Sequence, residues 1–113
     1  MASPEEIKNV LNQWIKKMEN PKIAEKFEDF NKTMQLVFPD IQYNLKLIFK
    51  NKTLSLEEGF DEKAEMKTEV HSDIWVGVLS KVIDPMEAFM RGDLKTEGDM
   101  KAMQKLELLS QID

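Results

Sequence analysis

The chain has 113 residues, and its 42% hydrophobic and 33% charged content is typical of a folded domain with a substantial core, not of a disordered segment. Its 16 basic and 21 acidic residues give a net charge of −5, and no basic stripe could neutralise nucleic-acid phosphates, so no nucleic-acid partner is expected. The lack of cysteine excludes disulfides and thiolate metal sites, and no apolar run approaches the ~20 residues of a membrane span. The N-terminus also lacks the features of a signal peptide. We therefore expect one domain over residues 1–113, located in the cytoplasm.

Two helices are predicted at the N-terminus. Ser3-Pro4-Glu5-Glu6 has the composition of a capping box with proline at the first helical position, and apolar residues recur at helical spacing as far as Met18. Asn20-Pro21 repeats this start signal. The spacing predicts a second amphipathic helix, which ends before Pro39 and whose apolar stripe is Ile23, Phe27, Phe30 and Met34.

The period changes to two after Pro39, which predicts β-strands. The first strand covers residues 41–49, a turn follows at Asn51-Lys52, and a second strand runs through Leu54 and Leu56 toward Phe60. Residues 64–70 alternate again, with a charged outer side, as in a half-buried antiparallel strand. We expect these three strands to form a meander.

The remaining chain is predicted to form two short helices, a strand and a final helix. Ser72 and Asp73 are expected to cap the first short helix, and Asp84-Pro85-Met86-Glu87 reads as a capping box for the second, with Gly92 as its left-handed end. A short strand is expected at 94–97, after which Asp99 caps the last helix. The predicted fold is α+β, with helices covering one face of a sheet.

Candidate chemistry is sparse. His71 is the sole histidine, and a metal site or a nucleophile–base pair needs more well-placed groups than it has nearby. The paired carboxylates stand at helix starts and turns, where they cap helices and solvate loops. The sequence therefore predicts no enzyme activity, no metal site and no cofactor.

Eight methionines are an unusually large number for this length. Methionine is flexible and fills irregular apolar shapes, so these residues could simply fill gaps in an ordinary core. They could also line a cavity for a lipid-like ligand between the sheet and the last helices. The candidate lining residues for that cavity are Trp75, Leu79, Phe89, Met90, Met100, Met103 and Leu106.

The segment IDPMEAFMRGDLKTEGDMKAMQKL resembles the signature region of the sterol carrier protein family. In that family a helix pair ends in a pattern like D-P-x-x-A-F-x-x-G, and a short strand and a G-D helix start follow. The matching positions are Asp84, Pro85, Ala88, Phe89, Gly92, Leu94, Gly98, Asp99, Met100 and Leu106. The similarity is good from about 64 to 109 and loose over residues 1–20.

The resemblance implies a mainly antiparallel sheet of about five strands covered on one face by helices, with an apolar tunnel between the layers. Since the periodicity supplies four strands, the fifth is expected from the 54–63 region. The resemblance also implies non-catalytic binding, and in some members transfer, of a fatty acid, fatty acyl-CoA or sterol. The end Ser110-Gln111-Ile112-Asp113 differs from the Ser-Lys-Leu type of peroxisomal address, so that location is not expected.

Two further functions stay open at this point. The chain could be an interaction or dimerisation module whose cavity is filled by its own side chains, and the pattern favours neither a monomer nor a homodimer. A small hydrolase or isomerase is the third possibility, with no candidate base beyond His71 and surface carboxylates.

Overall fold

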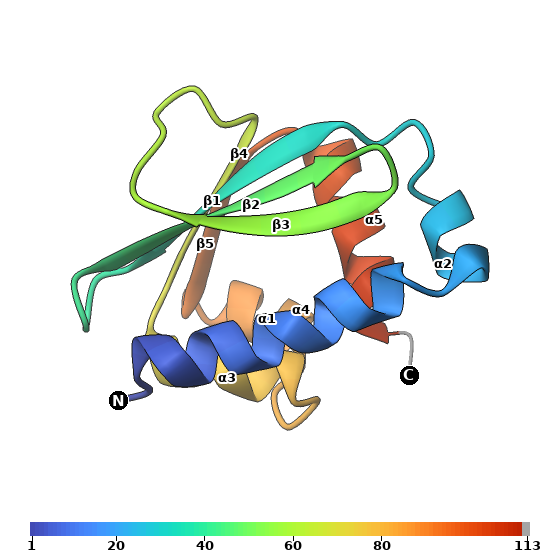
Figure 1. The fold of residues 1–113 in the computed structure, drawn as a ribbon. Helices are drawn as coiled ribbons and strands as arrows, with labels where there is room; N and C mark the ends of the chain where they lie inside the picture. Colours follow the sequence, from blue (N-terminus) through green and yellow to red (C-terminus); the bar gives the residue numbers. More distant parts are fainter. Residues whose placement is uncertain (112–113) are drawn as a thin grey trace.

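The computed structural model describes residues 1–111, which form a five-stranded sheet with α1, α3, α4 and α5 on one side of it (Figure 1). The elements in chain order are α1 (Pro4–Met18), α2 (Pro21–Glu25), β1 (Lys32–Phe38), β2 (Tyr43–Lys50), β3 (Thr53–Glu58), β4 (Met66–Val70), α3 (Ser72–Leu79), α4 (Pro85–Met90), β5 (Leu94–Gly98) and α5 (Met100–Gln111). No helix in this part of the chain is long and apolar enough to cross a bilayer. The predicted α+β class and the helix-covered sheet are confirmed.

The strand order is β3-β2-β1-β4-β5, with β1 and β4 parallel and the other neighbours antiparallel. The predicted meander is therefore wrong, because the strand at 66–70 pairs with β1 and not with β3. Alternating side chains of the central strands point toward the helices and are buried, as periodicity in a one-sided sheet requires. They are Met34, Leu36, Phe38, Leu45, Leu47, Phe49, Met66 and Val70.

The fifth strand comes from residues 32–38, not from the 54–63 region. The second predicted helix ends at Glu25, and turns carry the chain through Phe27 and Phe30 into β1. Both phenylalanines are buried, as the helical stripe predicted, but Met34 is buried from a strand. The missed signal was the alternation of Met34, Leu36 and Phe38 directly before Pro39.

Two clusters of aromatic rings hold the helices on the sheet. Trp14 of α1 packs edge to face against Trp75 of α3, with ring centroids 5.9 Å apart, and Trp75 also contacts Phe38 of β1. At the other end Phe27, Phe30 and Phe49 pack together, and the Lys105 ammonium of α5 lies 5.6 Å from the centroid of Phe27. Such pairs add to the free energy gained by burial, so each cluster fixes where a helix crosses the sheet.

The predicted helix caps are confirmed for four helices and wrong for α3. The side chains of Ser3, Asn20, Asp84 and Asp99 accept hydrogen bonds from the first turns of α1, α2, α4 and α5. In α3, the N-cap position is His71, whose side chain makes no capping bond. Ser72 instead donates its hydroxyl and its backbone N–H to the Asp40 carboxylate, at 2.6 and 3.0 Å, and accepts a bond from the Ala2 N–H.

Asp40 and Ser72 thus tie the β1–β2 turn, the start of α3 and the N-terminus together. Burial raises the pKa of Asp40, but the hydrogen bonds from Ser72 outweigh this effect and leave the pKa of the carboxyl below its ordinary value. Because the pKa of Asp40 is lower in the folded state, its ionised carboxylate stabilises the fold above the unfolded-state pKa. This stabilisation is lost as the pH falls through the folded-state pKa.

We predict that Asp40→Asn lowers the free energy of unfolding at neutral pH by about 1.5–3 kcal/mol, the range for a hydrogen bond to a charged group. The difference from the parent protein should shrink as the pH falls below the ordinary carboxyl pKa. Urea unfolding at several pH values measures this, and a difference that does not depend on pH would contradict the charged role of Asp40.

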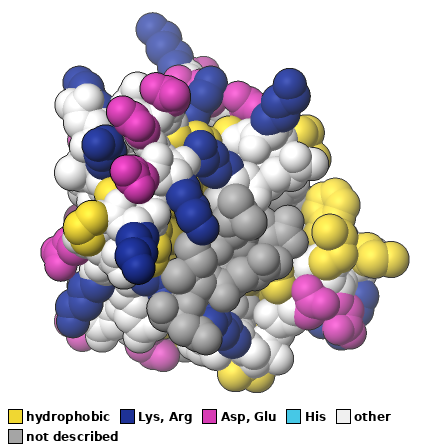
Figure 2. All heavy atoms as spheres, turned by 90° about the vertical axis from the view of Figure 1, so that its right-hand side faces the viewer, with side chains coloured by type: hydrophobic (Ala, Val, Ile, Leu, Met, Phe, Trp, Pro, Cys, Tyr) yellow, Lys and Arg dark blue, Asp and Glu magenta, His cyan; other side chains and the backbone are white. Residues whose placement is uncertain are grey.

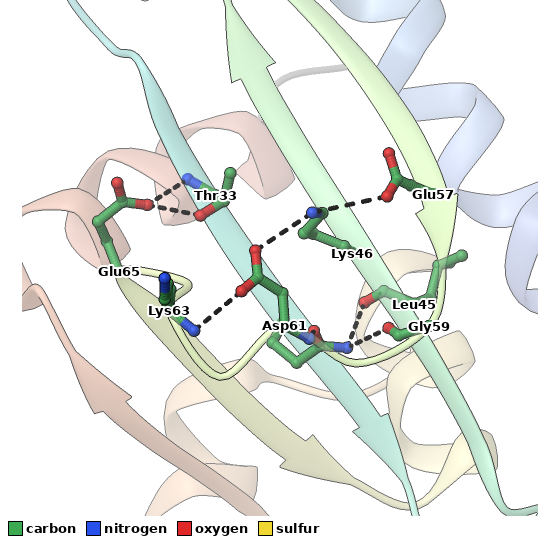
Figure 3. Close-up of polar contacts among 9 residues, drawn as sticks. Thr33, Leu45, Lys46, Glu57, Gly59, Asp61, Lys63 and Glu65 are labelled. Carbon is green, nitrogen blue, oxygen red and sulfur yellow. Dashed lines mark hydrogen bonds and ion pairs between the residues drawn. The ribbon is translucent and has the colours of Figure 1, made fainter.

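The connection from β3 to β4 crosses the outer face of the sheet and is held there by Gln35 of β1 (Figure 3). The Gln35 amide donates to the Gly59 carbonyl at 2.9 Å and accepts from the Asp61 N–H at 2.6 Å. Asp61 also pairs with Lys46, and Glu65 accepts two bonds from Thr33. Gln35 is therefore buried although it lies on the outer face of the sheet.

We predict that Gln35→Met, which keeps the side-chain length but removes these bonds, lowers the free energy of unfolding by about 1–3 kcal/mol because two backbone groups lose their partners. The matched control is Gln13→Met on the exposed side of α1. It should change the free energy of unfolding by less than about 0.5 kcal/mol. Denaturant unfolding of both variants tests this, and equal stabilities would show that Gln35 does not hold the connection.

Candidate ligand-binding cavity

A cavity of about 280 Å³ lies between β4–β5 and the helices α3, α4 and α5. Its floor is formed by inward-facing side chains of the sheet, Thr68 and Thr96 among them, and its walls by the three helices with Trp14 of α1. The lining residues are Trp14, Met34, Thr68, Trp75, Val78, Leu79, Pro85, Met86, Phe89, Leu94, Thr96, Met100, Met103, Gln104 and Leu106. This volume is close to the lower end for small-molecule sites.

None of these lining side chains is ionisable, and most of them are apolar. An ionised group placed deep in such a cavity would lose its hydration without a compensating partner, which is very costly. The cavity is therefore suited to neutral, mostly hydrocarbon groups, and a charged headgroup would have to stay at the rim.

The cavity opens to solvent beside α4. Of its lining residues, Met86, Phe89 and Met100 are about half exposed, and all three come from α4 or the start of α5. Figure 2, in which the right-hand side of Figure 1 faces the viewer, shows hydrophobic side chains gathered at one edge of the molecule. Large exposed apolar side chains beside an apolar cavity are typical of a ligand entrance.

Six of the seven residues predicted from the sequence lie around this cavity. Met90 does not, since its side chain points away and is 78% exposed. Whether the other six contact a ligand remains a prediction. His71 is exposed and lies outside the cavity, and no group of histidine, aspartate and glutamate side chains among those that the structure describes is arranged to hold a metal ion.

Sequence reasoning missed the floor of the cavity. Thr68 and Thr96 are paired across β4 and β5, and Leu94 lies two residues before Thr96 on the same side of its strand. The alternation in both strands could have identified these positions, but the assumed meander placed β4 beside the wrong neighbour. Trp14 and Met34 were assigned to the general core.

The comparisons with known proteins agree with this geometry. The model of the SCP-2 sterol transfer family matches residues 11–111. The chain belongs to the SCP-2 sterol transfer family. No curated protein sequence matches it.

Solved structures show that the fold is shared. The sterol carrier protein domain 2 of Helicoverpa armigera is 20% identical with a TM-score of 0.76, covering 97% of this chain and 91% of that one. The palmitated SCP2L2 of Aedes aegypti is 15% identical with a TM-score of 0.72, covering 96% and 95%. A sec-alkylsulfatase of Pseudomonas sp. is 22% identical with a TM-score of 0.67, covering 78% of this chain, which spans only 14% of that enzyme's length.

The exposed residues of α4 provide a matched test of the entrance. We predict that Phe89→Ala weakens the uptake of an apolar fluorescent dye about fivefold, or about 1 kcal/mol, because a lining contact is lost. Met90→Ala, on the same helix but outside the cavity, should change uptake less than twofold. Dye titrations of both variants measure this, and equal losses would place the binding surface outside the cavity.

Proposed function

We propose that this protein binds a hydrophobic small molecule, such as a fatty acid, a fatty acyl-CoA or a sterol, in the cavity between β4–β5 and α3–α5. The observation that carries the proposal is an open, uncharged cavity inside a fold whose family is named for sterol transfer. The palmitated SCP2L2 from Aedes aegypti, which has this fold, supports a fatty acyl ligand. Transfer between membranes and a cytoplasmic location are further predictions.

The proposal includes no chemical step on the ligand. The lining residues offer contacts and a few neutral polar groups, but no acid, base or activated nucleophile. The sulfatase that shares the fold is about seven times longer than the matching segment, so its activity gives no reason to assign catalysis to this chain.

The expected affinity is modest. Burying about ten methylene groups contributes roughly 8 kcal/mol at ~0.8 kcal/mol each. Association costs at least about 4 kcal/mol, and the cavity has no charged anchor to offset this cost. The difference is at most about 4 kcal/mol, which corresponds to a dissociation constant of roughly millimolar or weaker.

A titration with a conjugated-polyene fatty acid tests the proposal, in a Trp14→Phe background so that Trp75 alone reports from the cavity wall. We predict saturable quenching of the Trp75 emission at ligand concentrations up to about 1 mM, reversed by an unlabelled fatty acid or sterol. In the same background Thr96→Phe, which fills the cavity from its floor, should weaken binding at least tenfold. Lys95→Phe, the adjacent position on the opposite face of β5, should not.

A flat titration on folded protein would overturn the proposal. Sedimentation equilibrium on the same samples would then test the alternative of a dimerisation module. A stable dimer without ligand uptake supports that alternative.

A further inference from the structure

Three buried polar atoms of cavity-lining residues have no hydrogen-bond partner among the residues that the structure describes. They are the Thr68 hydroxyl and the indole nitrogens of Trp14 and Trp75. Leaving such a group unpaired in the interior normally costs about 1–3 kcal/mol, so native proteins pair nearly all of them. All three residues line the same cavity, so a molecule bound there is the candidate partner for these groups.

The position of Thr68 makes its hydroxyl the most informative of the three. It lies between Leu36 and Thr96 across the sheet, on the inner face of β4, and its side chain is 1% exposed. The flanking inward positions on β4 are Met66 and Val70, both buried and apolar. Valine would fill the same volume without an unpaired hydroxyl, so packing alone does not account for threonine at this position.

The two indole groups restrict what the partner can be. Each indole nitrogen is a donor only. The rings of Trp14 and Trp75 pack edge to face with an interplanar angle of 65°, a geometry that offers at best a weak N–H···π contact to one of them. A group that satisfies either indole must therefore be a hydrogen-bond acceptor, and the Thr68 hydroxyl can donate to the same kind of group.

The acceptor must also be uncharged. No lining side chain is ionisable, so an ionised carboxylate or phosphate in the interior would have no compensating charge. Ketone, ester and hydroxyl oxygens accept hydrogen bonds without a net charge.

We propose that the natural ligand carries a neutral oxygen, of the ketone, ester or alcohol class, in the part of the molecule that is buried in the cavity, and that this oxygen bonds to Thr68. The inference rests on the proposed ligand-binding function and deepens it. It assigns Thr68 as a specificity-determining residue that distinguishes an oxygenated lipid from a plain hydrocarbon chain of the same length.

The test compares Thr68→Val with the parent protein for two ligands of equal length, 2-decanone and decane. Direct comparison of the ligands is uninformative, because water solvates the ketone better than the alkane. The informative quantity is the factor by which Thr68→Val changes each dissociation constant, measured by displacement of an apolar dye. Thr68→Val should weaken the binding of 2-decanone about five- to tenfold, which is the effect of losing one net hydrogen bond. It should leave the dissociation constant for decane nearly unchanged.

Thr53→Val is the matched control, since Thr53 is an exposed threonine of β3 that lies outside the cavity. This variant should change the dissociation constant for 2-decanone less than twofold. A second readout needs no ligand: Thr68→Val should raise the melting temperature of the empty protein by about 4 °C, because an unpaired buried hydroxyl is removed.

The outcomes separate the two proposals. If both ligands bind and Thr68→Val affects them equally, the role of Thr68 is refuted while the binding function stands. Equal effects of Thr68→Val and Thr53→Val on the binding of 2-decanone would also refute it. If neither ligand displaces the dye from folded protein, both the binding function and this inference are refuted.

Discussion

The parallel pairing of β1 with β4 is the constraint on which the rest of this structure depends. It places β1 at the centre of the sheet, with β2–β3 on one side and β4–β5 on the other. In a simple meander, β4 would lie beside β3 and the floor made by Thr68 and Thr96 would not face α3–α5. The pairing requires the chain to cross the outer face of the sheet between β3 and β4, and Gln35 makes that crossing favourable by bonding to it from β1. A buried glutamine on the outer face thus supports a cavity on the inner face.

The two halves of the sheet differ in how completely they are covered. Over β2–β3 lies the fifteen-residue α1, whose buried stripe includes Ile7 and Leu11, and the core there is closed. Over β4–β5 lie α3 and α4, of eight and six residues, and the first turns of α5. Short helices bury less surface, so apolar side chains of α4 stay partly exposed and space remains beneath them.

The sequence was sufficient for most elements but not for their arrangement. Capping signals at Ser3, Asp84 and Asp99 and the two-residue alternation of 43–50 and 66–70 depend on local chemistry, which one sequence contains. The position of β4 depends on a long-range contact, and the segment at 32–38 was hidden because Phe27, Phe30 and Met34 also fit a helical spacing. Ser72 looked like a helix cap until the structure placed Asp40 within 2.6 Å of its hydroxyl.

The same limit applies to the cavity. Helix-borne lining residues such as Trp75 and Met103 could be named because a helix repeats its face every three to four residues. The alternation could also place Thr68 on the inner face of its strand, but it could not show that this position borders a cavity, because that depends on which strands and helices lie beside it. Its importance appears only when its neighbours are known and none of them offers its hydroxyl a partner.

The unpaired polar groups of the core belong to residues that border the cavity. Within the described residues, Trp14, Thr68 and Trp75 hold the buried unpaired side-chain atoms, and all three residues border the cavity. Unpaired groups lower the stability of the empty protein, whereas a ligand that pairs them stabilises the folded state through its binding free energy. The unpaired polar groups therefore belong to residues at which a bound molecule can pair them. This is the physical reason to look for the function of the protein in the cavity.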